Sequence, residues 1–157
     1  MTLTLANRQR TLKINGRYLR EITTVLLTEL AEPEAELEIN LVSPAQMAKV
    51  NQDFLQHEGP TDVITFDYRA PSPGAALHGE LFVCPAVAVT QAREFGTDWR
   101  SELVRYVIHG ILHLQGYDDL EPVARRRMKR VEGRTLRAIT RRFALSKLGA
   151  ASKLGNG

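Results

Sequence analysis

The segment 99–115 constrains the fold more than any other part of the chain, because its helical pattern is apolar on most sides. Its apolar residues are Leu103, Val104, Val107, Ile108, Ile111, Leu112 and Leu114. A helix that is apolar nearly all round lies in the core, so other elements must enclose it. The chain has 157 residues, of which 43% are hydrophobic, and a domain of this size buries such a core without disulfides.

The rest of the chain alternates between strand and helix patterns. The clearest strand has Leu37, Ile39 and Leu41 alternating with polar residues. The other expected strands are 62–68, 80–84, and an edge strand or strand pair within 3–14 that is interrupted near 7–10. The other expected helices are 16 to about 30, 44 to about 54 after an N-cap at Ser43, 85–95, and 122–143. These elements amount to about four strands and about five helices.

No linker divides the chain, so we expect a single domain over residues 1–145 and a flexible basic tail at 146–157. Cys84 is the only cysteine, which rules out an internal disulfide and is compatible with a reducing compartment. No apolar run is long enough to cross a bilayer, and residues 1–14 lack the pattern of a secretory signal. A protein without a membrane partner is therefore expected.

The net charge of +3 is distributed unevenly along the chain. Residues 121–157 contain eleven lysines and arginines against two acids, a net charge of +9, whereas residues 1–120 carry a net charge of −6. A basic terminal helix beside an acidic body is suited to a polyanion such as RNA. A simpler alternative is that the charged run is only a solvated helix face.

The segment 109–119 carries the residues with the clearest chemistry. His109 and His113 are four residues apart, so on a helix both imidazoles lie on one face, at the separation that two ligands of one metal ion need. Gly116 is expected to end the helix in a left-handed conformation and turn the chain back, which brings Asp118 or Asp119 toward the same ion. Three protein ligands leave a position open for water, as in catalytic zinc sites. The alternative is two core histidines that bond to backbone carbonyls.

Histidines four residues apart also occur in zinc metalloproteases, where a glutamate directly follows the first histidine and acts as general base. This chain has Gly110 at that position. Glycine neither accepts nor donates a proton, so the sequence argues against peptide hydrolysis by that mechanism.

Four segments together resemble a known family. They are Pro60-Thr-Asp-Val-Ile-Thr-Phe66, Gly79-Glu-Leu-Phe-Val-Cys84, Gln91-Ala-Arg-Glu-Phe-Gly96 and residues 109–119, which follow the pattern H-G-x-L-H-L-x-G-Y-D-H except at its last position. Met128 and Glu132 also occupy family-like positions. From about residue 51 to residue 132 the chain thus resembles the bacterial YbeY endoribonuclease family, also called the rRNA maturation factor family.

The resemblance implies one metal-dependent hydrolase domain of the α+β class, with a mixed sheet of about four strands packed by about five helices. It also implies a zinc ion held by three side chains in a cleft at the end of the central helix. It implies a cytoplasmic, single-strand-specific endoribonuclease that acts in ribosomal RNA maturation, including processing of the 16S rRNA 3′ end, and in ribosome quality control. The implied partners are ribosomal RNA and the small ribosomal subunit, with a ribosomal protein or a GTPase as a further candidate.

The chain departs from the family pattern at Asp119, where the family has its third histidine ligand. A carboxylate is an accepted zinc ligand, so the predicted metal ligands are His109, His113 and Asp119. The anionic ligand weakens the pull of the metal on bound water. It also makes Fe²⁺ or another divalent metal more plausible than three imidazoles do.

A second departure is Leu55, where the family usually has an arginine thought to meet the substrate phosphate. Arg69, Arg93 and Arg105 are candidates to replace that arginine. The residues predicted to bind RNA phosphates are Arg125, Arg126, Lys129 and Arg130 of the basic helix.

No residue is assigned as the catalytic general base. Asp118 is a candidate for orienting a ligand histidine, and His78 is a candidate for approaching the metal from a loop. Two alternatives to the endoribonuclease remain at this point. One is a non-catalytic ribosome-assembly factor with a structural metal, and the other is an iron oxygenase with two histidines and one carboxylate.

Overall fold

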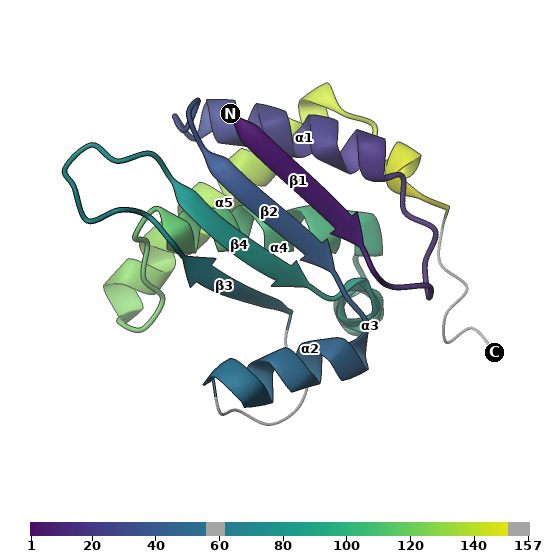
Figure 1. Cartoon of the computed structure of the whole chain (residues 1–157). Helices are drawn as coiled ribbons and strands as arrows, with labels where there is room; N and C mark the ends of the chain where they lie inside the picture. The colour runs from purple at the N-terminus through teal and green to yellow at the C-terminus, as the bar shows by residue number, and fades with distance from the viewer. Residues whose placement is uncertain (56–61, 151–157) are drawn as a thin grey trace.

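Four strands form a mixed sheet in the order β1-β2-β4-β3 in this computed structural model, which describes residues 1–55 and 62–150 (Figure 1). The strands are β1 (Thr2–Asn7), β2 (Glu36–Leu41), β3 (Val63–Asp67) and β4 (His78–Val83). β1 pairs with β2 and β2 with β4 in parallel, whereas β3 lies antiparallel beside β4 at the edge. The predicted α+β fold with a mixed four-stranded sheet is confirmed.

Within the described residues there are five α-helices, as predicted. They are α1 (Gly16–Glu29), α2 (Pro44–Val50), α3 (Pro85–Phe95), α4 (Trp99–Leu114) and α5 (Pro122–Arg142). A π-helical turn, η1 (Asn51–Leu55), continues α2, and a short 3₁₀ helix, η2 (Leu145–Leu148), follows α5. None of the helices in this described part of the chain is long and apolar enough to cross a membrane.

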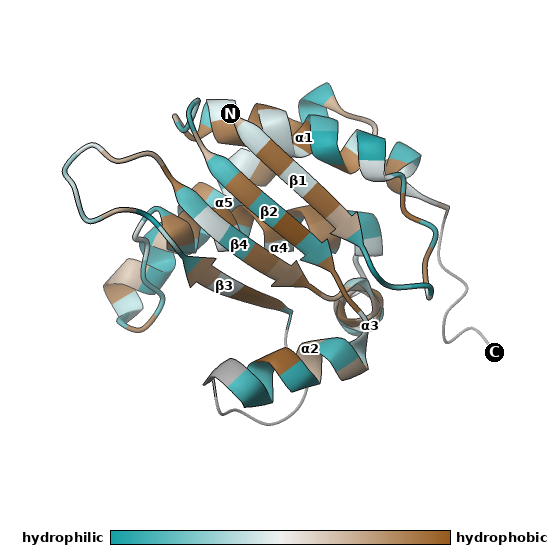
Figure 2. Cartoon of the chain, viewed as in Figure 1, coloured by the Kyte–Doolittle hydropathy of each residue, from teal (hydrophilic) through white to brown (hydrophobic). Residues whose placement is uncertain are grey.

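The central helix α4 packs on one face of the sheet together with α1 and α5, which lie behind the strands in Figure 1. The alternation in β2 places Leu37, Ile39 and Leu41 in the core beneath these helices. Figure 2 shows this alternation as brown and teal bands along the strands. On the other face, Met47 of α2 packs in a second, smaller cluster with Ile64 of β3.

Two glycines allow α4 to lie close to β4. A Cβ atom on Gly110 of α4 would lie 2.8 Å from Leu81 Cδ2, and one on Gly79 of β4 would lie 2.6 Å from Leu114 Cδ1. Such distances are shorter than van der Waals contact, so a larger residue would push the helix from the sheet. Gly110, which argued against a protease at the level of sequence, therefore has a packing role.

The N-terminal segment contains the predicted edge strand, because β1 lies at the edge of the sheet, but it does not form a strand pair. β1 ends at Asn7 and no second strand follows within residues 8–15. The Gln9 side chain donates to Asn7 Oδ1 at 2.9 Å and to the Leu12 carbonyl at 2.8 Å. These hydrogen bonds satisfy polar groups locally and hold the segment as a loop.

The flexible tail predicted for 146–157 is wrong for its first residues. Leu148 in η2 is fully buried, and Arg100 Nη1 donates to the Gly149 carbonyl at 2.9 Å. These contacts attach residues up to 150 to the domain, so its boundary lies beyond residue 145. Residues 151–157 lie outside the described part of the chain.

Candidate metal centre

His109 and His113 lie on one face of α4, as their spacing predicts, and their ring centroids are 4.6 Å apart. The helix ends just after them, where Gly116 adopts φ 96° and its amide donates to the His113 carbonyl at 3.0 Å. The Tyr117 amide also turns back and donates to the Leu112 carbonyl at 3.0 Å. This left-handed ending was predicted from Gly116, and it reverses the chain toward the histidines.

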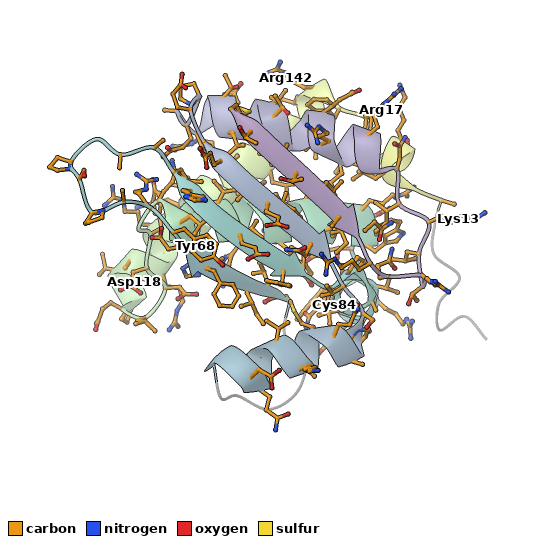
Figure 3. All side chains as sticks on the ribbon, in the orientation of Figure 1. Lys13, Arg17, Tyr68, Cys84, Asp118 and Arg142 are labelled. Atoms are coloured by element: carbon orange, nitrogen blue, oxygen red, sulfur yellow. The ribbon has the colours of Figure 1, made fainter. Side chains whose placement is uncertain are left out.

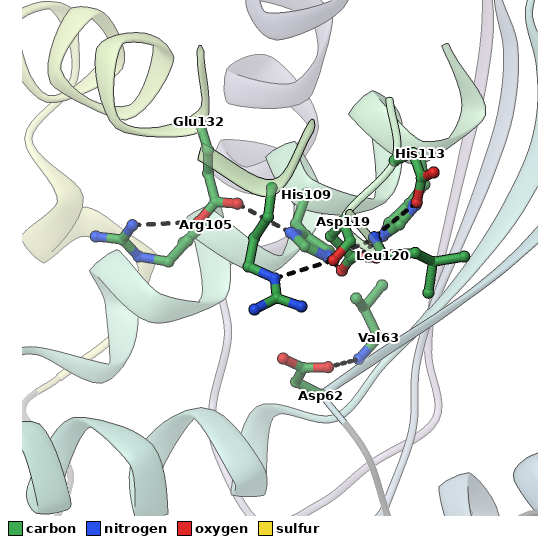
Figure 4. Close-up of polar contacts among 10 residues, drawn as sticks. Asp62, Val63, Arg105, His109, His113, Asp119, Leu120 and Glu132 are labelled. Atoms are coloured by element: carbon green, nitrogen blue, oxygen red, sulfur yellow. Dashed lines mark hydrogen bonds and ion pairs between the residues drawn. The ribbon is translucent and has the colours of Figure 1, made fainter. Parts of the chain in front are cut away.

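The reversed chain brings Asp119 to the two histidines (Figure 4). Asp119 Oδ2 lies 3.8 Å from His109 Nε2 and 3.6 Å from His113 Nε2, and the two Nε2 atoms are 3.0 Å apart. Ligands bound about 2.0–2.2 Å from a tetrahedral ion lie roughly 3.3–3.6 Å from one another. All three side chains are half-buried. The 3.6 Å separation lies in this range and the other two lie within about 0.3 Å of it, so small side-chain adjustments would let the donor set hold a divalent metal ion with a position open to solvent.

Glu132 of α5 orients the first histidine. Its Oε2 atom lies 2.9 Å from His109 Nδ1, and its Oε1 atom accepts from Arg105 Nη1 at 3.2 Å. With Nδ1 engaged by the carboxylate, the Nε2 atom of His109 faces Asp119 and His113. A carboxylate behind a histidine ligand is the usual way to fix ring orientation and increase ligand basicity.

The two imidazoles differ in proton affinity. The hydrogen bond to Glu132 raises the pKa of His109 above its ordinary value. Burial, followed by the charge on His109, lowers the pKa of His113. The pKa of Glu132 is lowered, because the bonds from His109 and Arg105 outweigh the opposing effect of its burial. Metal ligation needs neutral rings, so His113 is the better prepared of the two near neutral pH.

The carboxylate that orients a candidate histidine ligand is Glu132, and not Asp118 as the sequence suggested. Asp118 Oδ1 instead accepts from the Leu120 amide at 2.8 Å, and the residue is exposed on the loop after α4 (Figure 3). Glu132 could have been found from its place in the pattern of α5. It is an acid on the stripe that also buries Met128 and Leu136, and a buried carboxylate requires a partner.

The remaining predicted residues separate into two groups. Arg125 and Lys129 line the same cavity as His109 and Asp119, and Arg125 Nε donates to the Asp119 carbonyl at 3.0 Å. Arg126 and Arg130 are exposed on α5 and do not line that cavity.

His78 is not near the candidate ligands, which corrects the suggestion that it approaches the metal. It lies on the open sheet face, where Nε2 is 3.6 Å from Glu36 Oε2 and its ring packs against Tyr68. Of the three arginines considered as replacements at Leu55, Arg105 lines the cavity. Arg69 is paired with Glu32 at 3.3 Å. Leu55 ends η1, and its side chain is outside the described structure.

Comparison with known families places the chain in one of them. The model of the family described as Endoribonuclease YbeY matches residues 4–140. This chain belongs to the YbeY family. The resemblance inferred from the four sequence segments is thereby confirmed.

Similar proteins extend the comparison. An Endoribonuclease YbeY from Chlorobium luteolum is 43% identical over 59% of this chain and 66% of its own length. One from Acidothermus cellulolyticus is 34% identical over 88% of this chain and 91% of its own. The solution structure of TM1509 from Thermotoga maritima superposes with a TM-score of 0.65 at 26% identity, covering 90% of this chain and 91% of that one. The chain spans 63–69% of the length of the first three curated YbeY relatives.

Replacing Glu132 with glutamine is expected to weaken metal binding about tenfold or more. Loss of the charge weakens the bond that orients His109, and losing an outer partner of a metal ligand typically costs roughly 10–100-fold in affinity. Competition with a chromophoric chelator measures the dissociation constant. Glu121→Gln is the matched control, because Glu121 is the other acid of residues 121–157. Equal affinities in the two variants would contradict the role assigned to Glu132.

Proposed function

We propose that this chain is a metal-dependent endoribonuclease that cuts single-stranded ribosomal RNA. The proposal rests on the cluster of His109, His113 and Asp119 in a chain of the YbeY family. The cluster lies beside a cavity whose lining includes the cations Arg125 and Lys129. Two histidines and one carboxylate with an open coordination position are the ligand set of hydrolytic zinc sites. A cation-lined approach suits a phosphodiester substrate.

Each group in the site has a defined part in the proposed reaction. A metal ion, when bound, polarises a phosphoryl oxygen and lowers the pKa of a water molecule. His109, held by Glu132, and His113 supply the two nitrogen donors, and Asp119 supplies an oxygen. Arg125 and Lys129 attract and position the phosphate backbone. No side chain is assigned as a general base.

Zinc is the metal we propose. The two imidazoles and one carboxylate suit Zn²⁺, although the same donor types also suit Fe²⁺. Because Asp119 is anionic, the bound water is expected to be less acidic than with three imidazoles. Metal analysis of protein purified without added zinc tests the assignment, and iron at full occupancy would contradict it.

The biological setting is part of the proposal. We infer action on ribosomal RNA of the small subunit, including the 3′ end of 16S rRNA, in the cytoplasm and in ribosome quality control. A ribosomal protein or a GTPase would be a further partner. Relatives described as Endoribonuclease YbeY support the endoribonuclease activity. The basic face of α5 supports a polyanionic substrate.

Metal removal is expected to abolish cleavage of a single-stranded RNA that spans the 16S 3′ end. The expected cause is loss of the ion that activates water. Treatment with a chelator followed by dialysis should eliminate cleavage, and stoichiometric Zn²⁺ should restore it. The same RNA annealed to its complement should resist cleavage. Full activity of the metal-free protein would refute a metal-dependent reaction.

A non-catalytic assembly factor with a structural metal is the second candidate. Leu55 favours it, because this chain lacks the expected phosphate-binding arginine at that position. The two functions differ once metal is added back to the metal-free protein, because only the enzyme would regain RNA cleavage. A purely structural metal would raise the melting temperature when added back, by mass action on the folded state, yet would produce no cleavage of any RNA.

A further inference from the structure

A cavity of about 280 Å³ adjoins the candidate metal ligands. It lies among α3, α4 and α5, and His109 and Asp119 form part of its wall. Asp62, at the start of β3, faces the same space across from His109 (Figure 4). Ligand pockets commonly enclose roughly 300–1,000 Å³, so this cavity has room for a single flat group and not for a folded element of RNA.

Phe95 gives this cavity an aromatic surface open to solvent. It is the last residue of α3, its exposed fraction is 66%, and it lines the cavity. The other large hydrophobic side chains that are exposed in the described residues do not line it. Met128 of α5 and Gln91 of α3 also contribute to the wall. An exposed ring in such a place is available to stack on a flat ligand.

The cations on the α5 side of the cavity suit the phosphate of a nucleotide, whereas the acids Asp62 and Glu102 line the cavity elsewhere. Arg125 and Lys129 lie on the α5 side, and both are exposed. A nucleotide combines an anionic phosphate with a flat base, and here cations and candidate metal ligands stand beside an exposed aromatic ring. Proteins that bind single-stranded nucleic acid use this combination of cationic groove and aromatic platform.

We propose that the cavity binds one unpaired nucleobase next to the scissile phosphate, with Phe95 as its stacking platform. This inference rests on the proposed ribonuclease function and assigns the substrate contact that would hold the strand beside the metal. A duplex cannot offer an unstacked base, so the contact also explains a requirement for single-stranded RNA. Stacking tolerates every base, and purines are favoured because they stack more strongly.

A two-by-two comparison of protein and substrate tests the stacking contact. The zinc-loaded wild type and Phe95→Ala are assayed on a short single-stranded RNA whose cleavage site has been mapped, and on versions lacking the base on either side of the cut. Base stacking on an aromatic side chain accounts for roughly 5- to 150-fold in affinity. We expect about tenfold loss in kcat/KM from Phe95→Ala and about tenfold from one of the two abasic sites. The two changes together should cost no more than either alone.

Two further variants control for folding and for exposed aromatic residues in general. Phe95→Trp retains a platform and should keep at least wild-type kcat/KM. Tyr68→Ala removes an aromatic ring that is 50% exposed on the open face of the sheet (Figure 3), and it should leave cleavage unchanged. Because Phe95 is mostly exposed, its truncation should leave the melting temperature near that of the wild type.

The outcomes separate this inference from the function on which it rests. If the wild type cleaves the RNA but the losses in kcat/KM from Phe95→Ala and from the abasic site multiply when combined, the stacking contact is overturned. The proposed ribonuclease function would not be affected by that result. Equal rates for wild type and Phe95→Ala on the intact RNA would also overturn the stacking contact. Failure of the zinc-loaded wild type to cleave any of the RNAs would instead refute the proposed function itself.

Discussion

Replacing His113 with alanine is expected to reduce RNA cleavage at least about a thousandfold. The substitution removes one of two nitrogen donors from the candidate metal centre. A catalytic metal contributes several kcal/mol of transition-state stabilisation, and about 1.4 kcal/mol corresponds to a tenfold change in rate. Single-turnover cleavage of an end-labelled single-stranded RNA measures the loss.

The control for this experiment is His78→Ala, which removes a histidine from the opposite face of the sheet. That variant should cleave RNA like the wild type. The His113 side chain is only 29% exposed but lies at the end of α4, so His113→Ala should keep its helical circular dichroism spectrum. Equal cleavage by wild type and His113→Ala would mean that the observed activity does not come from this site.

Asp119→Ala is expected to lower metal affinity by more than about a hundredfold. Losing a group that only orients a metal ligand typically costs roughly 10–100-fold, and losing a ligand itself should cost more. Asp119 is the only carboxylate in the three-residue cluster formed by the described residues, and its removal leaves two protein ligands. Loss of a ligand also removes the negative charge that offsets part of the charge of the ion. Isothermal titration with Zn²⁺ measures affinity and stoichiometry.

Asp118→Ala is the matched control, because it removes the neighbouring carboxylate, whose oxygen bonds to the Leu120 amide. Its zinc affinity should stay within about threefold of the wild type, since the carboxylate touches no candidate ligand. Asp119→His restores the family pattern and should keep a stoichiometric zinc ion with a more acidic bound water. Unchanged zinc affinity in Asp119→Ala would show that Asp119 is not a ligand.

Local patterns were sufficient to predict most of the fold. The apolar residues of 99–115 marked the central helix, and alternation at Leu37, Ile39 and Leu41 marked a strand buried on one face. Both patterns follow directly from burial on one side or on all sides of an element. The edge strand β1 was one of two alternatives predicted for residues 3–14. The pattern did not show that the strand ends at Asn7, because the hydrogen bonds of Gln9 that hold the following loop produce no sequence periodicity.

The candidate centre was predictable only in part. His109, His113 and Asp119 lie within eleven residues of sequence, so helix periodicity and a glycine turn suffice to bring them together. Glu132 lies 23 residues beyond His109, and no local rule pairs them. Arg105 reaches the same carboxylate from α4, and this contact also depends on how α4 and α5 pack.

The sequence by itself determined the class of fold, the two candidate histidine ligands and the basic character of α5, and the resemblance to the YbeY family selected Asp119 over Asp118 as the third candidate ligand. Only the tertiary structure decided that Glu132 orients His109, that Arg125 and Lys129 but not Arg126 and Arg130 line the cavity, and that Phe95 borders it. These features depend on the relative placement of α3, α4 and α5. That placement results from the packing of α3 and α5 against α4, which itself lies on the sheet, where Gly110 and Gly79 set how closely α4 approaches β4.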